Sequence, residues 1–139
     1  MSSAHTELYL HLVWATHRRQ ALITHALQPR IYGAIADQCA KMRSDVIAIG
    51  GMPDHTHLLL RYRPTVTIAE IARRVKGASS HLANQAAGAH AFRWQDGYGA
   101  FTVSRSMVPR VRAYVLDQER HHAAGTLSPT FERTTPPPE

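Results

Sequence analysis

Two histidines spaced two residues apart, His55 and His57, are the first side chains in this sequence that suggest a chemical role. They precede an apolar run, Leu58-Leu59-Leu60, which is typical of a buried strand. Successive side chains of a strand point to opposite faces, so both imidazoles are expected on the same face. Neutral imidazole nitrogen is a common ligand for divalent metal ions. The pair therefore predicts half of a metal site, although a chain with ten histidines can also carry such a pair as surface decoration.

A tyrosine and a glutamine near the end of the sequence form a second candidate group. Tyr114 and Gln118 are four residues apart, so they share one face of the helix expected over residues 107–123. A phenol becomes a nucleophile once its proton is removed, and an amide oxygen can bind a metal ion. Facing a strand with two imidazoles, this pair resembles an active site. On the helix alone, the simpler interpretation is an amphipathic edge.

The charge balance favours a nucleic-acid partner. The chain of 139 residues has 16 Lys and Arg against 10 Asp and Glu, which gives a formal net charge of +6. Lys41 and Lys76 are the two lysines, so arginine dominates, and its planar fork binds phosphate oxygens and stacks on bases. The alternative is a solvated basic surface without such a partner.

The composition also limits the class of protein. The length suits one domain with its own hydrophobic core. Cys39 is the single cysteine, which excludes a disulfide framework and a cysteine-based zinc site. The sequence shows no signal-peptide pattern and no apolar run that approaches a membrane span. A cytoplasmic protein without a membrane partner is therefore expected.

Hydrophobic periodicity predicts the elements that must position these groups. The expected order is a strand over 7–16, a helix over 29–42, strands over 46–51 and 55–62, a helix over 68–85, a strand over 98–104 and the helix over 107–123. This order predicts an α+β domain of the ferredoxin-like class over residues 1–124, with an antiparallel sheet and helices on one face. The other face is expected to be free for binding. The Pro- and Thr-rich residues 125–139 are expected to form a flexible tail.

Basic and small polar side chains on or beside these elements are candidates for contacts with DNA phosphates. Arginine and lysine supply charge, and small residues let a phosphate approach the backbone. For residues 77–80 a helix-packing face is an equal alternative. The candidates are Arg18, Arg19, Arg61, Arg63, Arg73, Arg74, Lys76, Ser79 and Ser80.

Five segments of the sequence together resemble a known family. They are residues 9–16, 51–59, 75–80, 94–104 and 111–122, the last containing Tyr-x-x-x-Gln. Their order and spacing are similar to those of the single-tyrosine HUH transposases of small bacterial insertion sequences. This is the TnpA type, within the IS200-like transposases in the broad sense, and it includes the repeat-associated tyrosine transposases. The resemblance covers about residues 5–123.

This resemblance implies a ferredoxin-like (RRM-like) fold and a homodimer that acts on single-stranded DNA, often at a hairpin near the element's end. His55 and His57 match the family's metal-binding histidines, Gln118 matches its third ligand, and together they would hold Mg²⁺ or Mn²⁺. Tyr114 matches the nucleophile. In family members the tyrosine helix can be exchanged between subunits. Three neighbouring side chains are candidates for orienting the ligands or moving protons, each with a purely structural role as the alternative: Asp54, Glu119 and His121.

The implied reaction follows from the chemistry of these groups. A divalent ion neutralises the charge of a phosphodiester, and a tyrosine hydroxyl with its proton removed can attack the phosphorus. The products are a covalent 5′-phosphotyrosine and a free 3′-hydroxyl, and a 3′-hydroxyl can reverse the step without ATP.

Two departures from the family pattern bear on these expectations. Thr56 stands where a bulky apolar residue is usual, which tests packing rather than metal binding. The chain also ends soon after the tyrosine helix, so contacts made by longer relatives would be missing.

Three alternatives remain open from the sequence. A domesticated nuclease that cleaves repeat hairpins would share the fold and chemistry, and only paired element ends in the flanking DNA would separate the two. A non-catalytic RRM-like binding module is disfavoured because the expected central strand offers His55, His57 and Arg61 instead of stacking aromatics. A metal-dependent hydrolase that uses water predicts that Tyr114→Phe keeps cleavage.

Overall fold

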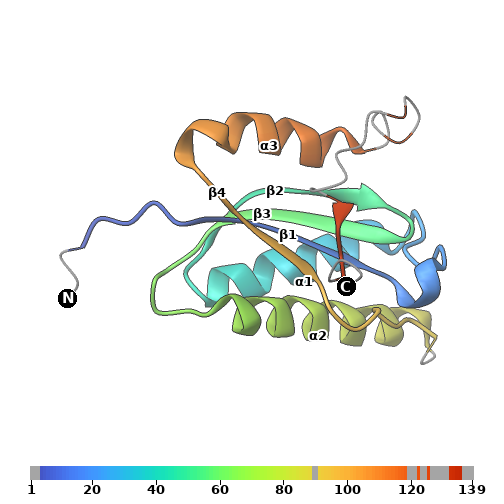
Figure 1. Ribbon diagram of the computed structural model, residues 1–139. Helices are drawn as coiled ribbons and strands as arrows, with labels where there is room; N and C mark the ends of the chain where they lie inside the picture. The colour runs from blue at the N-terminus through green and yellow to red at the C-terminus, as the bar shows by residue number, and fades with distance from the viewer. Residues whose placement is uncertain (1–3, 89–90, 119–121, 123–124, 126–131, 136–139) are drawn as a thin grey trace.

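A four-stranded antiparallel sheet forms the centre of the protein, with two long helices on one side and a short helix on the other (Figure 1). The computed structural model describes residues 4–88, 91–118, 122, 125 and 132–135. The elements are β1 (Tyr9–Ala15), η1 (His17–Arg19), α1 (Gln28–Lys41), β2 (Asp45–Met52), β3 (His55–Arg61), α2 (Ile68–Ala87), β4 (Gly99–Val103), η2 (Arg105–Met107) and α3 (Val108–Leu116). The strands lie in the order β2-β3-β1-β4. The predicted α+β class and the predicted order of strands and helices are confirmed.

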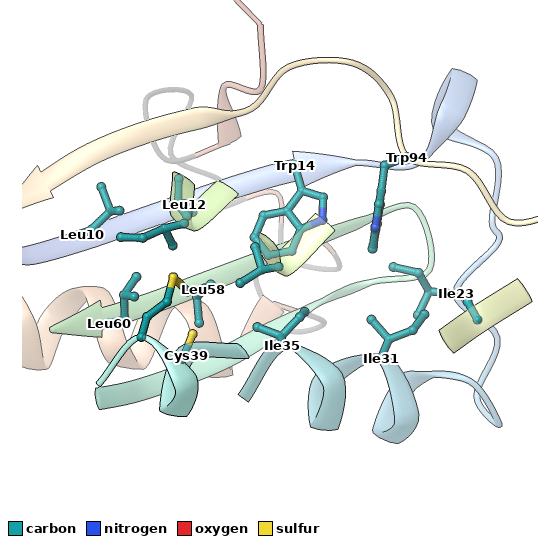
Figure 2. Close-up of a cluster of buried hydrophobic side chains, with 14 of the residues drawn as sticks. Leu10, Leu12, Trp14, Ile23, Ile31, Ile35, Cys39, Leu58, Leu60 and Trp94 are labelled. Carbon is teal, nitrogen blue, oxygen red and sulfur yellow. The ribbon is translucent and has the colours of Figure 1, made fainter. Parts of the chain in front are cut away.

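The face of the sheet toward α1 and α2 is apolar. Leu10 and Leu12 of β1 and Leu58 and Leu60 of β3 are fully buried there, because alternate residues of a strand share a face. Thr56 lies on this face too and is fully buried. The helical spacing of three to four residues places a matching stripe of α1 against these strands, as Figure 2 shows. That stripe consists of Ile31, Ile35 and Cys39.

The opposite face of the sheet is partly covered by α3, which packs on β2 and β3. A smaller apolar cluster forms there from Ala48, Leu59, Val111 and Val115. Gly50 permits the close approach, because a Cβ at this position would overlap the carbonyl oxygen of Val115. This face was expected from the sequence to be free for binding, and the structure corrects that expectation over the area beneath α3.

The ends of α2 follow its sequence. The hydroxyl of Thr67 accepts a hydrogen bond from the backbone N–H of Glu70, which is an N-cap interaction. Gly88 ends the helix in the left-handed conformation that glycine adopts most easily. None of the described helices is long and apolar enough to cross a membrane.

The predicted range of the tyrosine helix, 107–123, is interrupted in the structure. α3 spans Val108–Leu116, and Gln118 and His122 are again helical. Pro109 stands in its first turn, where a missing N–H is tolerated. Residues 119–121 and 123–124 lie outside the described residues. The predictions for Glu119 and His121 therefore stay predictions.

A short C-terminal segment, residues 132–135, lies against the end of β4 on the same side as α3. A Cβ at Gly99 would overlap the carbonyl oxygen of Arg133, so the absence of a side chain makes room for the segment's backbone. Thr134 is buried. These four residues contact the sheet in the structure, and the flexible tail expected over 125–139 stays a prediction.

Candidate active site

The two histidines of β3 lie side by side on the face toward α3. His55 and His57 are 1% and 0% exposed, and their ring centroids are 5.1 Å apart. β3 is paired on both edges, with β2 and with β1, so the backbone beneath the imidazoles is held on both sides. The predicted arrangement of the pair on one strand face is present in the structure.

Each imidazole has a partner on its Nδ1 atom. Nδ1 of His55 is 2.7 Å from Oδ1 of Asp54, and Nδ1 of His57 is 2.8 Å from Nε2 of His11 in β1. A metal ion binds an imidazole nitrogen that carries no proton, and a hydrogen bond at the other nitrogen fixes which one that is. These contacts would therefore leave both Nε2 atoms available to an ion.

Tyr114 and Gln118 come to the same place from α3 and the residues just after it. The rings of His57 and Tyr114 are 6.0 Å apart between centroids. Oε1 of Gln118 is 3.3 Å from Nε2 of His55, while its Nε2 donates to the carbonyl oxygen of Tyr114 at 2.9 Å. The four side chains that the sequence singled out thus meet within a single chain.

A fifth side chain, Glu132, enters this group from the C-terminal segment. Its Oε1 is 3.2 Å from Nε2 of His55, and its Oε2 is 3.1 Å from Nε2 of His57. The hydroxyl of Tyr114 donates to Oε2 at 2.6 Å. Nε2 of His122 lies 3.7 Å from Oε1. In Figure 1 the C-terminal segment 132–135, in red, runs across the direction of the strands.

Three residues of this site were not singled out as site residues by sequence reasoning. His11 lies on the same face of the sheet as His57, and strand alternation could have indicated this once the pairing of Val13 with His57 was known. His122 falls within the segment that carried the family resemblance. Glu132 has no sequence signal that points to the site, because it stands in a Pro- and Thr-rich region without periodicity.

Burial and hydrogen bonding act differently on the titratable groups. Burial, aided by the nearby His57, lowers the pKa of His11 to about 3, and burial also lowers the pKa of His57. Burial alone would lower the pKa of His55, but hydrogen bonds and charges from Glu132 and Asp54 outweigh it and raise that pKa. Burial would raise the pKa of Glu132, yet its contacts with His55 and His57 hold it well below the ordinary value.

The donor atoms fit a divalent ion. Donor atoms of His55, His122 and Glu132 all lie within 4.8 Å of one another, and Gln118 adds an amide oxygen beside His55. Imidazole nitrogen together with carboxylate and amide oxygen forms a mixed set that suits first-row divalent ions and magnesium. The protein therefore has a possible metal site formed by histidine and glutamate side chains.

The residues expected to contact DNA are spread over several surfaces. Arg18 and Arg19 belong to η1, and Nη1 of Arg19 is 3.9 Å from Oδ2 of Asp54, at the edge of the site. Arg61 and Arg63 stand at and beyond the other end of β3. At about 3.3 Å per residue along a strand, Arg61 lies about 20 Å from His55. Arg18 and Arg19 are close enough to contact a DNA strand bound at the site. Arg61 and Arg63 could contact only DNA that extends well beyond the site.

The candidates on α2 lie on the side of the sheet away from the site. Arg73 pairs with Glu70, and Arg74 donates to the side chain of Gln38. The remaining three, Lys76, Ser79 and Ser80, bond to main-chain carbonyls: Gln95 and Gly97 for Lys76, Val75 for Ser79 and Gly77 for Ser80.

Ser79 needs a correction. Its side chain is fully buried, and its hydroxyl accepts a hydrogen bond from Nε1 of Trp94 at 3.0 Å. DNA cannot reach a hydroxyl in this position, so the alternative interpretation of a helix-packing face holds at Ser79.

The sequence matches the family described as "Transposase IS200 like" over residues 4–118. The chain therefore belongs to the IS200-like transposases, the family of single-tyrosine transposases. These proteins are DNA-processing enzymes of DNA recombination, and the family resemblance inferred from the sequence is confirmed.

Individual relatives agree with this assignment. The chain is 27% identical over 120 residues to the ISDra2 transposase TnpA of Deinococcus radiodurans, covering 81% of this chain and 84% of that protein. Its fold is similar to a crystal structure of a Deinococcus radiodurans protein assigned as a transposase, with a TM-score of 0.68, 24% identity and coverage of 83% and 93%. It is also similar to a REP-associated tyrosine transposase bound to a REP hairpin, with a TM-score of 0.62, 17% identity and coverage of 91% and 76%.

Proposed function

We propose that this transposase cleaves and rejoins single-stranded DNA through a covalent 5′-phosphotyrosine intermediate, with Tyr114 as the nucleophile. We further propose that His55, His57 and Gln118 hold a divalent ion, Mg²⁺ or Mn²⁺. The observation that supports this most is the convergence of the four side chains, from β3 and from the α3 region, in one buried group. Chance would not bring the only tyrosine and glutamine of that helix region to the two histidines.

The cleavage step forms one bond to phosphorus and breaks another. The hydroxyl oxygen of Tyr114 forms a bond to the phosphorus, the bond from phosphorus to the 3′ oxygen breaks, and the 3′ oxygen takes up a proton from water and leaves as a hydroxyl. The carboxylate of Glu132 accepts a hydrogen bond from the hydroxyl of Tyr114 and orients it, and the proton of Tyr114 passes to water as the bond to phosphorus forms. When bound, a divalent ion supplies charge neutralisation at the phosphate oxygens.

Rejoining follows from the same bond. The phosphotyrosine link keeps the energy of the cleaved phosphodiester, so a 3′-hydroxyl from another strand can attack it and release Tyr114. Water in place of tyrosine would leave a nick that needs another energy source to reseal. Tyrosine is therefore the nucleophile that suits strand exchange.

We propose single-stranded DNA with a hairpin as the substrate and a homodimer as the acting form. The net charge of +6 and the arginines of η1 favour an anionic strand at the site. The relative with a similar fold is bound to a REP hairpin, which makes a hairpin the first probe to use. Sedimentation of the purified protein, with and without the hairpin, checks the dimer.

One labelling experiment tests the reaction. The protein is incubated with Mg²⁺ or Mn²⁺ and hairpins with single-stranded flanks taken from the DNA around its own gene, labelled at either the 5′ or the 3′ end. A 5′-phosphotyrosine link predicts that the 3′-labelled strand gives a denaturant-resistant protein adduct, and the 5′-labelled strand a shorter free product. Tyr114→Phe is expected to abolish the adduct. Tyr62→Phe, which alters a tyrosine packed against the apolar core, is the matched control and should keep it.

Two results would contradict the proposal. An adduct that survives in Tyr114→Phe would mean that another residue is the nucleophile. Cleavage without any adduct in that variant would favour a hydrolase that uses water.

Mixing variants tests whether the tyrosine helix is exchanged between subunits. Neither Tyr114→Phe nor the double variant His55→Ala/His57→Ala should form an adduct by itself. A co-expressed heterodimer of the two forms one only if Tyr114 of one subunit serves the histidines of the other. No adduct from a folded heterodimer would mean that each chain uses its own tyrosine, as in the arrangement described above.

A further inference from the structure

The carboxylate of Glu132 lies between the two imidazoles and the tyrosine of the site, although it comes from the C-terminal segment. We propose that Glu132 is a further ligand of the divalent ion and that the segment 132–135 is the element that delivers it. This inference rests on the proposed metal site and extends its ligand set. It gives the C-terminal segment a function that no part of the tyrosine helix supplies.

Three pairwise distances are those of neighbouring ligands around one ion. An octahedral ion with bonds of about 2.1 Å has adjacent ligand atoms about 3 Å apart. Nε2 of His55 is 3.2 Å from Oε1 of Glu132 and 3.3 Å from Oε1 of Gln118. Nε2 of His57 is 3.1 Å from Oε2 of Glu132. The same distances also suit an ion pair with a protonated imidazole, so the test must measure metal binding itself.

The chemistry of the ligand set favours a carboxylate. His55, His57 and Gln118 offer neutral donors, and imidazole by itself does not favour magnesium or manganese over zinc, copper or nickel. Magnesium and manganese prefer carboxylate oxygen, which also neutralises part of the ion's charge in a buried site. An ion held by these side chains would still be open to phosphate oxygens of the DNA.

The position of Glu132 is set by the sheet. Gly99 of β4 has no side chain, and the carbonyl oxygen of Arg133 occupies the space where one would be. Thr134, the next residue after Arg133, is buried, so the backbone that follows Glu132 packs against the sheet. The hydroxyl of Tyr114 donates to Oε2 of Glu132 and thereby holds the nucleophile next to the proposed ion.

Calorimetric titration of the full chain with Mn²⁺, supported by Mn²⁺ electron paramagnetic resonance, tests the assignment. We expect Glu132→Gln to weaken Mn²⁺ binding at least about 10-fold and to change the resonance spectrum, since a direct ligand should matter at least as much as the outer partners of a ligand. Glu70→Gln, at an exposed glutamate of α2, is the matched control and should bind as the wild type does. Gly99→Ala should weaken binding as well, because it removes the seat of the segment, whereas Gly77→Ala, with open space around it, should not.

The outcomes separate this inference from the proposed function. If the wild-type chain binds no Mn²⁺, the proposed metal site itself is refuted. If the wild type binds Mn²⁺ and Glu132→Gln binds it with the same affinity and the same resonance spectrum, only the role of Glu132 is refuted. If Glu132→Gln binds Mn²⁺ with the wild-type affinity and forms the adduct faster than the wild type, the role as a ligand is refuted too, and the carboxylate is identified as a competitor of the DNA phosphate. Wild-type affinity in Gly99→Ala would refute the seating on Gly99.

Discussion

The two faces of the sheet use the same strands for opposite purposes. Toward α1 and α2, β1 and β3 present Leu12 and Leu58, which are paired across the strands and fully buried. Toward α3, the next residues along the strands are Val13 and His57, also paired and also fully buried. Burying leucine contributes to stability, whereas burying imidazole costs free energy unless its nitrogens find partners. The comparison indicates that the α1/α2 face stabilises the fold, whereas the α3 face also carries the side chains of the proposed active site.

The largest expected effect belongs to the α3 face. His57→Ala should lower adduct formation about 1,000-fold or more, because a metal ion contributes several kcal/mol to the transition state and each 1.4 kcal/mol is tenfold. The free energy of unfolding should fall as well, because the substitution leaves a cavity and removes the hydrogen-bond partner of the buried Nε2 of His11, so the adduct is counted per folded molecule. Adduct assays and urea unfolding on the same preparation check both. A variant that loses stability but keeps its activity would reverse the division between the two faces.

The neighbouring residue on the other face should respond in the opposite way. Leu58→Ala removes a fully buried side chain from the core, so the free energy of unfolding should fall by about 2–5 kcal/mol. Adduct formed per folded molecule should stay within about twofold of the wild type. If this variant does not fold, Ile35→Val, expected to cost about 0.5–1.5 kcal/mol, gives the same comparison.

Gly50 of β2, where α3 packs on the sheet, should affect activity only through the position of α3. Gly50→Ala places a Cβ against the carbonyl oxygen of Val115, so α3 must shift away from β2 and carry Tyr114 with it. A misplacement of about 1 Å can lower a rate about 100-fold, which is the size of the loss expected in the adduct assay. Gly33→Ala, on α1 with open space around it, is the control and should behave like the wild type. Equal activity of the two variants would mean that the fit of α3 on β2 does not set the tyrosine's position.

The same division explains which features could be predicted from the sequence. The α1/α2 face follows from local periodicity: Leu58 and Leu60 alternate, and Ile31 and Ile35 recur at helical spacing. His55 and His57 on one strand face, and Tyr114 and Gln118 on one helix face, are predictions of the same local kind. Periodicity was sufficient wherever a side chain's surroundings are set by its own element.

What the sequence could not supply depends on contacts between distant elements. The role of His11 needs the register of β1 on β3, and the close packing of α3 on the sheet needs the room that Gly50 leaves. Glu132 was missed because a single carboxylate in a Pro- and Thr-rich stretch carries no pattern. Ser79 was misassigned to a DNA surface because its small polar side chain does not reveal whether it faces water or Trp94.

The smallest effect expected on the α3 face concerns His11, a positioning residue that touches His57 and not the proposed ion. Its Nε2 is 2.8 Å from Nδ1 of His57, and burial keeps His11 neutral. His11 can therefore accept a hydrogen bond from the N–H at Nδ1 of His57, which leaves Nε2 of His57 without a proton and free for a metal. His11→Leu should weaken Mn²⁺ binding about 10-fold, at the lower end of the range for such partners. His11→Gln, whose amide can still reach Nδ1, should restore most of the affinity. If both variants bind Mn²⁺ as the wild type does, His11 only fills space beside Phe101, and the buried imidazole pair is a packing feature of this face.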